Sequence, residues 1–413
     1  MSGLAYPRRQ ACPTKAGALD LDDAYKAMAW LGTLDADRRS TAEAVEEALY
    51  RHRQPLFGTV SIAFFDTTSL WFEGAGGESL GQRGHSKDYR GHLKQVVLGI
   101  VLDDADRPIA SFLMPGNTAD VTMLVPVVRR LRERFGIAKA CIVADRGMIS
   151  AATMAALEAE KIEYILGVRE RTSREVREEI IDDDELAVPL VITRQKGATE
   201  LAVRETTIAG RRYIICRNEE EARKDAEARS ELVAGLERKL AHGDKALVAN
   251  KGFRRFLKTP KGDGFVIDRA KIEADARFDG LFVLRTNTKI AALQVVLRYR
   301  NLLAVEDAFR TAKALLATRP IFHKTDAGIR GHVFCTFLAL VLRKELIDRL
   351  TARHSKLEWQ RIIDDLADLS EIQVEQDDRR ALLRTAPGPT IDPICRAIGL
   401  TLPPVFQEMP PAS

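Results

Sequence analysis

The chain has 413 residues, of which 30% are charged and 46% hydrophobic, and its formal net charge is +4 at pH 7. This length is too great for one simple core, so we expect two or three domains, and the small positive charge permits nucleic-acid binding without demanding it. The five cysteines include no CxxC pair, which argues against a disulfide framework or a zinc site and fits a reducing cytosol.

Residues 1–57 are predicted to form a small helical region. Leu21, Ala24, Met28 and Leu31 recur at three- and four-residue steps, so they share one face of a helix. Ser-Thr-Ala-Glu at residues 40–43 is a capping-box pattern and predicts the start of a second helix. The region could bind DNA or could pack on the domain that follows, because no recognition-helix signature separates the two.

A sheet is predicted to begin near residue 60. The apolar strand Val60–Phe65 ends at Asp66. Two further apolar runs, Gln95–Leu102 and Pro108–Met114, are separated by polar residues, which is a hairpin signal. We therefore expect three sequential antiparallel strands. Asp120 is expected to cap the helix after them.

The next strands alternate with helices. Ala140–Ala144 is continuously apolar, as a strand covered on both faces should be, and it ends at Asp145. A helix over residues 150–160 and a strand over Tyr164–Val168 follow. Three antiparallel strands, then helix, strand, helix and strand, form the order of a ribonuclease-H-like α/β fold.

An insertion is expected between the two halves of this core. It should occupy residues 169–280, dividing the core into 58–168 and 281–350, with 351–413 as a C-terminal helical region and tail. The insertion contains three strand-like runs and a charge-rich helix, namely Val188–Thr193, Leu201–Ile208, Tyr213–Arg217 and Glu219–Leu240.

A basic stretch within the insertion, residues 250–261, combines cations with two phenylalanines. Lys251, Arg254 and Arg255 could neutralise phosphates, and Phe253 and Phe256 could stack on bases. The stretch could equally be a basic loop whose phenylalanines belong to the core.

The stretch from Tyr299 to Lys313 is predicted to be one helix, because it holds good helix formers and neither Gly nor Pro. Tyr299, Glu306 and Lys313 are seven residues apart and would share one face. Phe309 belongs to an apolar stripe on the same side, where a carboxylate needs a partner or a metal ion. A half-exposed Glu306 paired with Arg310 is the alternative.

Three acids are predicted to converge. Asp66 and Asp145 each follow an apolar strand, and ligands gather at the carboxyl ends of strands in α/β sheets. Glu306 could reach the same place from a helix packed on the sheet. Three close carboxylates repel each other unless cations balance them, and two Mg²⁺ ions would do so while clamping the oxygens of a phosphoryl transfer. Taken alone, each aspartate could instead be an ordinary acid at a strand end.

These motifs resemble those of bacterial insertion-sequence DDE transposases of the cut-and-paste type (insertion-sequence four-like), which carry a Y-x2-R-x3-E-x6-K signature. The matching pieces follow the family's order over about residues 59–350: Phe65-Asp-Thr-Thr68, Ser86-Lys-Asp-Tyr-Arg90, Pro115-Gly-Asn-Thr-Ala-Asp120, Ala144-Asp-Arg-Gly147, Tyr299 with Glu306, Phe309-Arg310 and Lys313, Arg319-Pro320 and Gly331-His332. The signature arginine is replaced by Leu302. Relatives often carry a base-trapping aromatic in the insertion. No tryptophan lies between Trp71 and Trp359, so either Phe253 or Phe256 takes this role or the base-trapping aromatic is absent.

The resemblance implies a ribonuclease-H-like fold with a β-rich insertion. It also implies a transposase that cuts phosphodiester bonds at transposon ends and transfers the 3′-hydroxyl to target DNA. Asp66, Asp145 and Glu306 would be the catalytic ligands of two Mg²⁺ ions, which Mn²⁺ could replace. The expected DNA-binding residues are Tyr299, Arg300, Arg310, Lys313, Arg146, Lys251, Arg254 and Arg255.

The implied partner is double-stranded DNA, both the terminal inverted repeats and the target, with a homodimer assembled on it. The longest apolar run, Val333 to Leu342, is too short to span a bilayer, and no apolar signal core is seen, so a bacterial cytoplasmic, nucleoid-associated protein is expected. Two alternatives stay open: a nuclease of the same fold without strand transfer, and a decayed or truncated DNA-binding relative without activity.

Overall fold

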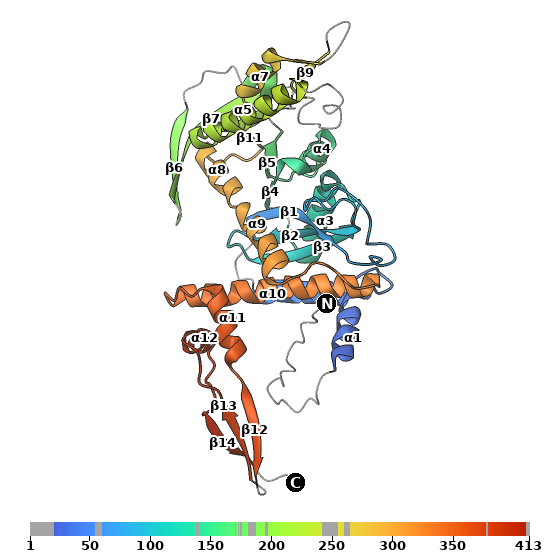
Figure 1. Ribbon diagram of the computed structural model, residues 1–413, viewed down its shortest axis with the longest axis vertical. Coiled ribbons are helices and arrows are strands. Elements are labelled where there is room, and N and C mark those ends of the chain that lie inside the picture. Colours follow the sequence, from blue (N-terminus) through green and yellow to red (C-terminus); the bar gives the residue numbers. More distant parts are fainter. Residues whose placement is uncertain are drawn as a thin grey trace. The chain divides into compact units, whose positions relative to one another are not determined.

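The computed structural model describes residues 20–53, 60–137, 140–169, 171, 173, 176–180, 187–194, 197–241, 255–259, 265–376 and 379–409. The chain divides into two units (Figure 1). The first, called here the terminal unit, consists of Met1–Ala44, Gly74–Glu78 and Thr311–Ser413. The second, called the sheet unit, consists of Val45–Glu73 and Ser79–Arg310.

The sheet unit is built on a nine-stranded sheet in the order β3-β2-β1-β4-β5-β11-β8-β7-β6. Its strands are β1 (Ile62–Trp71), β2 (Gln95–Leu102), β3 (Pro108–Pro115), β4 (Cys141–Ala144), β5 (Tyr164–Val168), β6 (Val188–Arg194), β7 (Gly197–Ile208), β8 (Arg211–Arg217) and β11 (Leu281–Thr286).

The predicted order of three antiparallel strands followed by two parallel strands is confirmed. β1 pairs antiparallel with β2 and β2 with β3, whereas β4 pairs parallel with both β1 and β5. β4 is buried along its whole length, as expected for a strand covered on both faces. The β2–β3 hairpin is fixed by Asp103, whose Oδ1 accepts hydrogen bonds from the backbone N–H groups of Ala105 and Arg107, both at 2.9 Å.

Three strands of the expected insertion, β6, β7 and β8, extend this same sheet, whereas β9 (Leu257–Lys258) and β10 (Val266–Ile267) pair with each other. β11 pairs antiparallel with β5 on one side and with β8 on the other, and β8 continues to β7 and β6. A small core of Tyr213, Ile215, Val283, Phe278 and Val176 supports this half. The insertion and the first half of the core therefore share one mixed sheet.

Several helices of the sheet unit pack on its strands. A capping box begins α2 as predicted, because the N–H of Glu43 donates to Ser40 Oγ at 3.3 Å and the N–H of Ser40 donates to Glu43 Oε2 at 3.0 Å. Val127 and Leu131 of α3 belong to the main core together with Phe65 and Phe112 of the sheet. The helices are α2 (Thr41–Arg53), α3 (Leu124–Phe135), α4 (Ala151–Ala159), α5 (Glu219–Ala241), α7 (Arg269–Ala276), α8 (Ala292–Arg300) and α9 (Leu303–Arg310).

The prediction of one continuous helix from Tyr299 to Lys313 is wrong. α8 ends at Arg300, α9 begins at Leu303, and a π-helix over Thr311–Leu315 follows. Between the two α-helices the backbone hydrogen bonds span three residues instead of the four of an α-helix. The N–H of Leu302 donates to the carbonyl of Tyr299, and the N–H of Val305 donates to the carbonyl of Leu302. The seven-residue spacing therefore does not place the three signature positions on one helix face.

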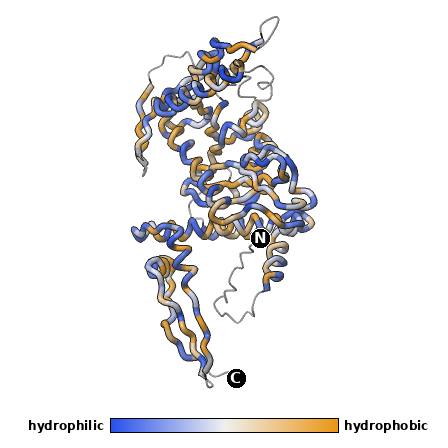
Figure 2. The backbone as a smooth tube through the Cα atoms, viewed as in Figure 1, coloured by the Kyte–Doolittle hydropathy of each residue, from blue (hydrophilic) through white to orange (hydrophobic). Residues whose placement is uncertain are grey.

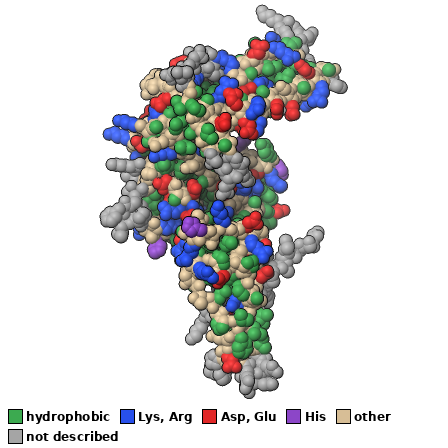
Figure 3. All heavy atoms as spheres, turned by 90° about the vertical axis from the view of Figure 1, so that its left-hand side faces the viewer, with side chains coloured by type: hydrophobic (Ala, Val, Ile, Leu, Met, Phe, Trp, Pro, Cys, Tyr) green, Lys and Arg blue, Asp and Glu red, His purple; other side chains and the backbone are tan. Residues whose placement is uncertain are grey.

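The terminal unit contains α1 (Leu21–Gly32), α10 (Asp326–Ala352), α11 (Trp359–Asp368), α12 (Ile391–Ile398), and a sheet of β12 (Glu371–Gln376), β13 (Arg379–Arg384) and β14 (Phe406–Met409). α1 packs on α10 through glycines: a Cβ on Gly331 would lie 1.8 Å from the Met28 carbonyl oxygen, and one on Gly32 would lie 2.0 Å from that of Ala327. Hydrophobic side chains are exposed on the three-stranded sheet, among them Ile372 and Phe406. Figure 3 shows hydrophobic side chains together with charged ones on the surface.

Hydrophobic and hydrophilic segments alternate along the backbone (Figure 2). Within the described ranges, no helix combines the length and the apolar character needed to cross a membrane.

Candidate active site

The register of the central strands places Asp66 and Asp145 side by side. The parallel pairing of β1 and β4 ends with the partners Phe65 and Ala144, and each aspartate is the next residue of its chain. Asp145 follows the end of β4, as predicted. The prediction that Asp66 ends its strand is wrong, because β1 continues to Trp71 through its pairing with β2.

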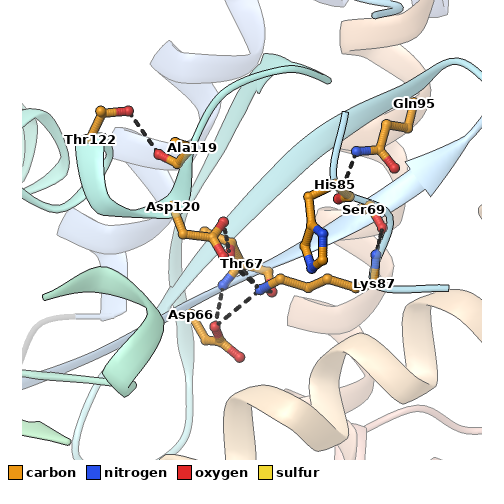
Figure 4. Close-up of polar contacts among 9 residues, drawn as sticks. All are labelled: Asp66, Thr67, Ser69, His85, Lys87, Gln95, Ala119, Asp120 and Thr122. Atoms are coloured by element: carbon orange, nitrogen blue, oxygen red, sulfur yellow. Dashed lines mark hydrogen bonds and ion pairs between the residues drawn. The ribbon is translucent and has the colours of Figure 1, made fainter. Parts of the chain in front are cut away.

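Asp66 lies in a cluster of polar side chains that reach it from two loops (Figure 4). Lys87 Nζ lies 3.7 Å from Asp66 Oδ1 and 3.3 Å from Asp120 Oδ2. The same ammonium donates to the carbonyl and the hydroxyl oxygens of Thr67, at 2.6 and 2.7 Å. The Thr67 hydroxyl in turn donates to Asp120 Oδ1 at 2.7 Å. One lysine thus bridges two carboxylates on neighbouring segments.

Burial raises the pKa of the Asp66 carboxyl to about 6. The positive charge of Lys87 and the N–H of Thr67 act in the opposite direction, while the nearby carboxylates of Asp145 and Asp120 raise the pKa further. An additional cation would stabilise the ionised form of this carboxyl, because its charge would offset both the burial and the repulsion from the neighbouring carboxylates.

The backbone around Lys87 is held in place by the sheet. Its N–H donates to Ser69 Oγ of β1 at 3.0 Å. Gln95 Nε2, at the start of β2, donates to the carbonyls of His85 and Gly116, both at 3.0 Å (Figure 4).

Sequence reasoning missed the roles of Lys87 and Asp120. Both stand in motifs that mark the resemblance, Ser86–Arg90 and Pro115–Asp120, but the spacing of those motifs contains nothing that brings them to Asp66. The prediction that Asp120 caps a helix is wrong, since the N-cap of the short helix Asp120–Thr122 is Ala119 and the Asp120 side chain binds Thr67 and Lys87.

Tyr299, from the last turn of α8, positions Asp145. Its hydroxyl donates to Asp145 Oδ1 at 3.0 Å. Burial, and then the Asp145 carboxylate, raise the pKa of Tyr299, so the phenol stays protonated and acts as a donor. Gly167 in β5 leaves room for this contact, because a Cβ there would lie 2.4 Å from the Tyr299 hydroxyl.

Glu306 lies on α9, which packs against β1 and β2. Its side chain is exposed, and Arg310 forms its ion pair with Asp307 at 3.2 Å, so the alternative of a Glu306–Arg310 pair is not what the structure has. In the part of the chain that the structure describes, no three acidic, histidine or cysteine side chains are close enough to form a metal site. The structure thus brings Asp66 and Asp145 together, and the convergence of Glu306 with them stays a prediction.

The predicted DNA-binding residues lie in different parts of the chain. Arg146 directly follows Asp145 and is exposed, and Arg300 ends α8. Lys313 belongs to the terminal unit. Arg255 pairs with Asp275 at 2.7 Å and lies 4.4 Å from the centre of the Phe256 ring.

The base-trapping interpretation of Phe256 is wrong, because that side chain is only 1% exposed and belongs to a core with Val233 and Leu236 of α5. Lys251, Phe253 and Arg254 lie outside the described residues.

Comparisons with known proteins identify the family of the chain. The family model described as a transposase DDE domain matches residues 61–342, which is more than half of the chain. No curated protein matches. Among solved structures, the chain is similar to piggyBac transposase in its synaptic complex with hairpin DNA, at 9% identity and a TM-score of 0.35, over 73% of this chain and 50% of that one.

A second similar structure is the Mos1 transposase paired-end complex with the left transposon end, at 15% identity and a TM-score of 0.19, over 38% of this chain and 46% of that one. The chain therefore spans about half the length of each of these two proteins or less. The match over residues 61–342, which contains Asp66, Asp145 and Glu306, shows that the chain belongs to the DDE transposase family.

Proposed function

We propose that the chain is a DNA transposase that cuts phosphodiester bonds at the ends of its transposon and joins the freed 3′-hydroxyl to target DNA. The observation that carries the proposal is the adjacent placement of Asp66 and Asp145 within the stretch that matches the family. The order of antiparallel and parallel strands supports a ribonuclease-H-like core, in which two such acids stand on neighbouring central strands.

Asp66 and Asp145 fit divalent cations in type and placement, because they are neighbouring carboxylates and Mg²⁺ prefers oxygen ligands. In this proposal they hold two Mg²⁺ ions, for which Mn²⁺ can substitute, and Glu306 contributes from α9. When bound, the ions supply Lewis-acid stabilisation of the attacking and leaving oxygens. Burial and the neighbouring carboxylates raise the pKa of Asp66, and a bound cation would offset both effects, which supports this role.

The other residues of the site position these acids. Tyr299 occupies Asp145 Oδ1, which leaves Oδ2 for a ligand and fixes the rotation of the carboxylate. Lys87 holds Asp66 and Asp120 near each other from the opposite side. Such positioning matters because phosphoryl transfer depends mainly on alignment and charge stabilisation.

The proposed partners are the terminal inverted repeats and the target duplex, bound by a homodimer in the bacterial cytoplasm at the nucleoid. Exposed Arg146 directly follows a proposed metal ligand and so would lie near the reacting phosphate. Further phosphate contacts are proposed for Tyr299, Arg300, Arg310, Lys313, Lys251, Arg254 and Arg255.

The test is cleavage of a duplex that carries the inverted repeats flanking the gene, in Mg²⁺. Asp66→Asn and Glu306→Gln should each slow cleavage by roughly 10²–10³-fold or more, the loss typical of removing one transition-state stabiliser. Asp307→Asn is the matched control, because Asp307 is the exposed neighbour of Glu306 on α9 and forms an ion pair with Arg310 at 3.2 Å. Gel-shift binding of the same duplex should stay intact in all three variants.

Wild-type rates in Asp66→Asn would refute the acid site, and wild-type rates in Glu306→Gln would remove that residue from it. Joining of pre-cut ends to a plasmid separates transposition from its rivals. Cleavage without joining would indicate a nuclease, and binding without cleavage would indicate an inactive relative.

A further inference from the structure

The segment between β1 and β2 carries an aromatic side chain that packs on nothing. This segment, residues 84–94, is called here the 84–94 loop. Tyr89 in it is 99% exposed. Of the exposed large hydrophobic side chains that the structure describes in the sheet unit, Tyr89 is the only aromatic one. A ring with this exposure adds nothing to the packing of the fold and is accessible to a ligand.

The backbone at Tyr89 is in the left-handed region, with φ of 58°. A bulky residue is uncommon there, and such strain gathers at functional sites. Three hydrogen bonds to Ser86 hold the conformation: Ser86 Oγ accepts from the N–H groups of Asp88 at 3.3 Å and Arg90 at 3.1 Å, and the Ser86 carbonyl accepts from the N–H of Tyr89 at 3.4 Å. The ring is therefore presented by a fixed turn.

The 84–94 loop is tied to the proposed catalytic acids. Lys87 reaches Asp66 and Thr67 with its ammonium and Ser69 with its N–H, and Gln95 holds the His85 carbonyl (Figure 4). Tyr89 follows Lys87 by two residues, so their Cα atoms are at most about 7.6 Å apart, because consecutive Cα atoms are about 3.8 Å apart. The exposed ring thus lies on the segment that borders Asp66.

Cationic residues flank Tyr89 in the sequence. Arg90 follows it directly, and its guanidinium lies 4.5 Å from the centre of the Trp71 ring, which fixes the direction of the planar donor group. Arg83, Lys87 and Lys94 add further positive charge to the same stretch. An exposed aromatic ring among cations is the combination that binds unpaired nucleotides, since bases stack on the ring while the cations neutralise phosphates.

We propose that Tyr89 stacks on an unpaired base next to the cleaved phosphodiester and that Arg90 binds an adjacent phosphate. This inference rests on the proposed transposase function and assigns its DNA contact to the 84–94 loop. A stacked base at this position would hold the strand end against the acids while the phosphate is exchanged.

The test uses the terminal-repeat duplex with 2-aminopurine placed singly at each of the nucleotides flanking the cut, because this base loses fluorescence on stacking. Wild type and Tyr89→Phe should both quench one of these positions. Tyr89→Ala should lose that quench and should bind a pre-cut end with an unpaired base about 5- to 150-fold more weakly, the range reported for losing one stacked base. Its affinity for a fully paired duplex of the same length should change little.

His92→Ala is the matched control, because His92 is an exposed ring in the same loop whose backbone is not in the left-handed region. Arg90→Gln should weaken binding of both DNAs and reduce its dependence on salt. The proposal is overturned if Tyr89→Ala keeps the quench and the affinity while wild type cuts the duplex. If wild type neither binds nor cuts it, the proposed function fails first, and the base contact fails with it.

Discussion

Replacing Gly167 by alanine is a direct way to test how Tyr299 controls Asp145. A Cβ at this position would lie 2.4 Å from the Tyr299 hydroxyl and 3.2 Å from both Tyr299 Cζ and the backbone nitrogen of Arg146. Ordinary contacts of a Cβ begin near 3.4 Å. The hydroxyl must therefore move by about 1 Å, which stretches its 3.0 Å bond to Asp145 beyond hydrogen-bond range.

The expected cost of Gly167→Ala is about 1–3 kcal/mol in the free energy of unfolding, the usual range for overpacking a closely fitted site. Cleavage should fall by up to about 10²-fold, because misplacement of a catalytic group by about 1 Å has effects of this size. Urea unfolding and single-turnover cleavage of the terminal-repeat duplex measure the two. Gly91→Ala is the control, since nothing lies within 4 Å of its Cβ position.

The decisive measurement combines Gly167→Ala with Tyr299→Phe. The phenylalanine ring lacks the oxygen at 2.4 Å and leaves only the 3.2 Å contacts, so the alanine should cost less stability in that background. We expect a coupling energy on the order of 1 kcal/mol or more between the two changes. Additive effects, or wild-type cleavage by Gly167→Ala, would refute the account of Tyr299 as the residue that orients Asp145.

Two further predictions concern buried charge in the sheet unit. Lys87→Met removes a positive charge beside Asp66 and should raise the pKa of Asp66 above about 6, so the acid limb of the cleavage–pH profile in limiting Mg²⁺ should move to higher pH. Lys87→Arg should largely restore the wild-type profile. An unchanged profile in Lys87→Met would show that Lys87 does not balance the charge of Asp66. Burial also raises the pKa of Glu46 to about 7, so the folded protein keeps a proton that the unfolded chain releases above about pH 4.5. The free energy of unfolding should therefore fall by up to about 3 kcal/mol as pH rises from about 4.5 to about 7. Glu46→Gln should remove this slope in urea unfolding, with Arg134 still paired to Glu47 at 2.9 Å; a slope that persists would assign the effect to other groups.

The parts of the fold that follow from local pattern were predictable. The continuous apolar run of Ala140–Ala144 predicted a strand covered on both faces, which the structure has as Cys141–Ala144, and its end predicted the place of Asp145. Two apolar runs joined by polar residues predicted the β2–β3 hairpin, and Ser40 with Glu43 predicted a helix start. In each case the physical cause lies within a few residues of the feature.

The parts that failed depend on contacts between distant segments. β1 passes Asp66 because β2 continues to pair with it after β4 has ended, and nothing near Asp66 encodes that. Leu302 lies in a tightened turn that breaks the expected helix although its neighbours are good helix formers. Lys87 reaches Asp66 only once the loop that carries it has docked on β1, so its position in the chain gave no sign of its place in the site.

The central position of β11 has a consequence for how an active molecule is made during synthesis. Asp66 and Asp145 lie on strands that can pair as soon as β5 has left the ribosome, but α9 with Glu306 follows β11, which fits between β5 and β8. Pairings between such distant segments form late, because closing a long loop costs entropy before the contacts compensate for it. In the proposed site, a nascent chain would therefore hold Asp66 and Asp145 together before α9 could bring Glu306 to them.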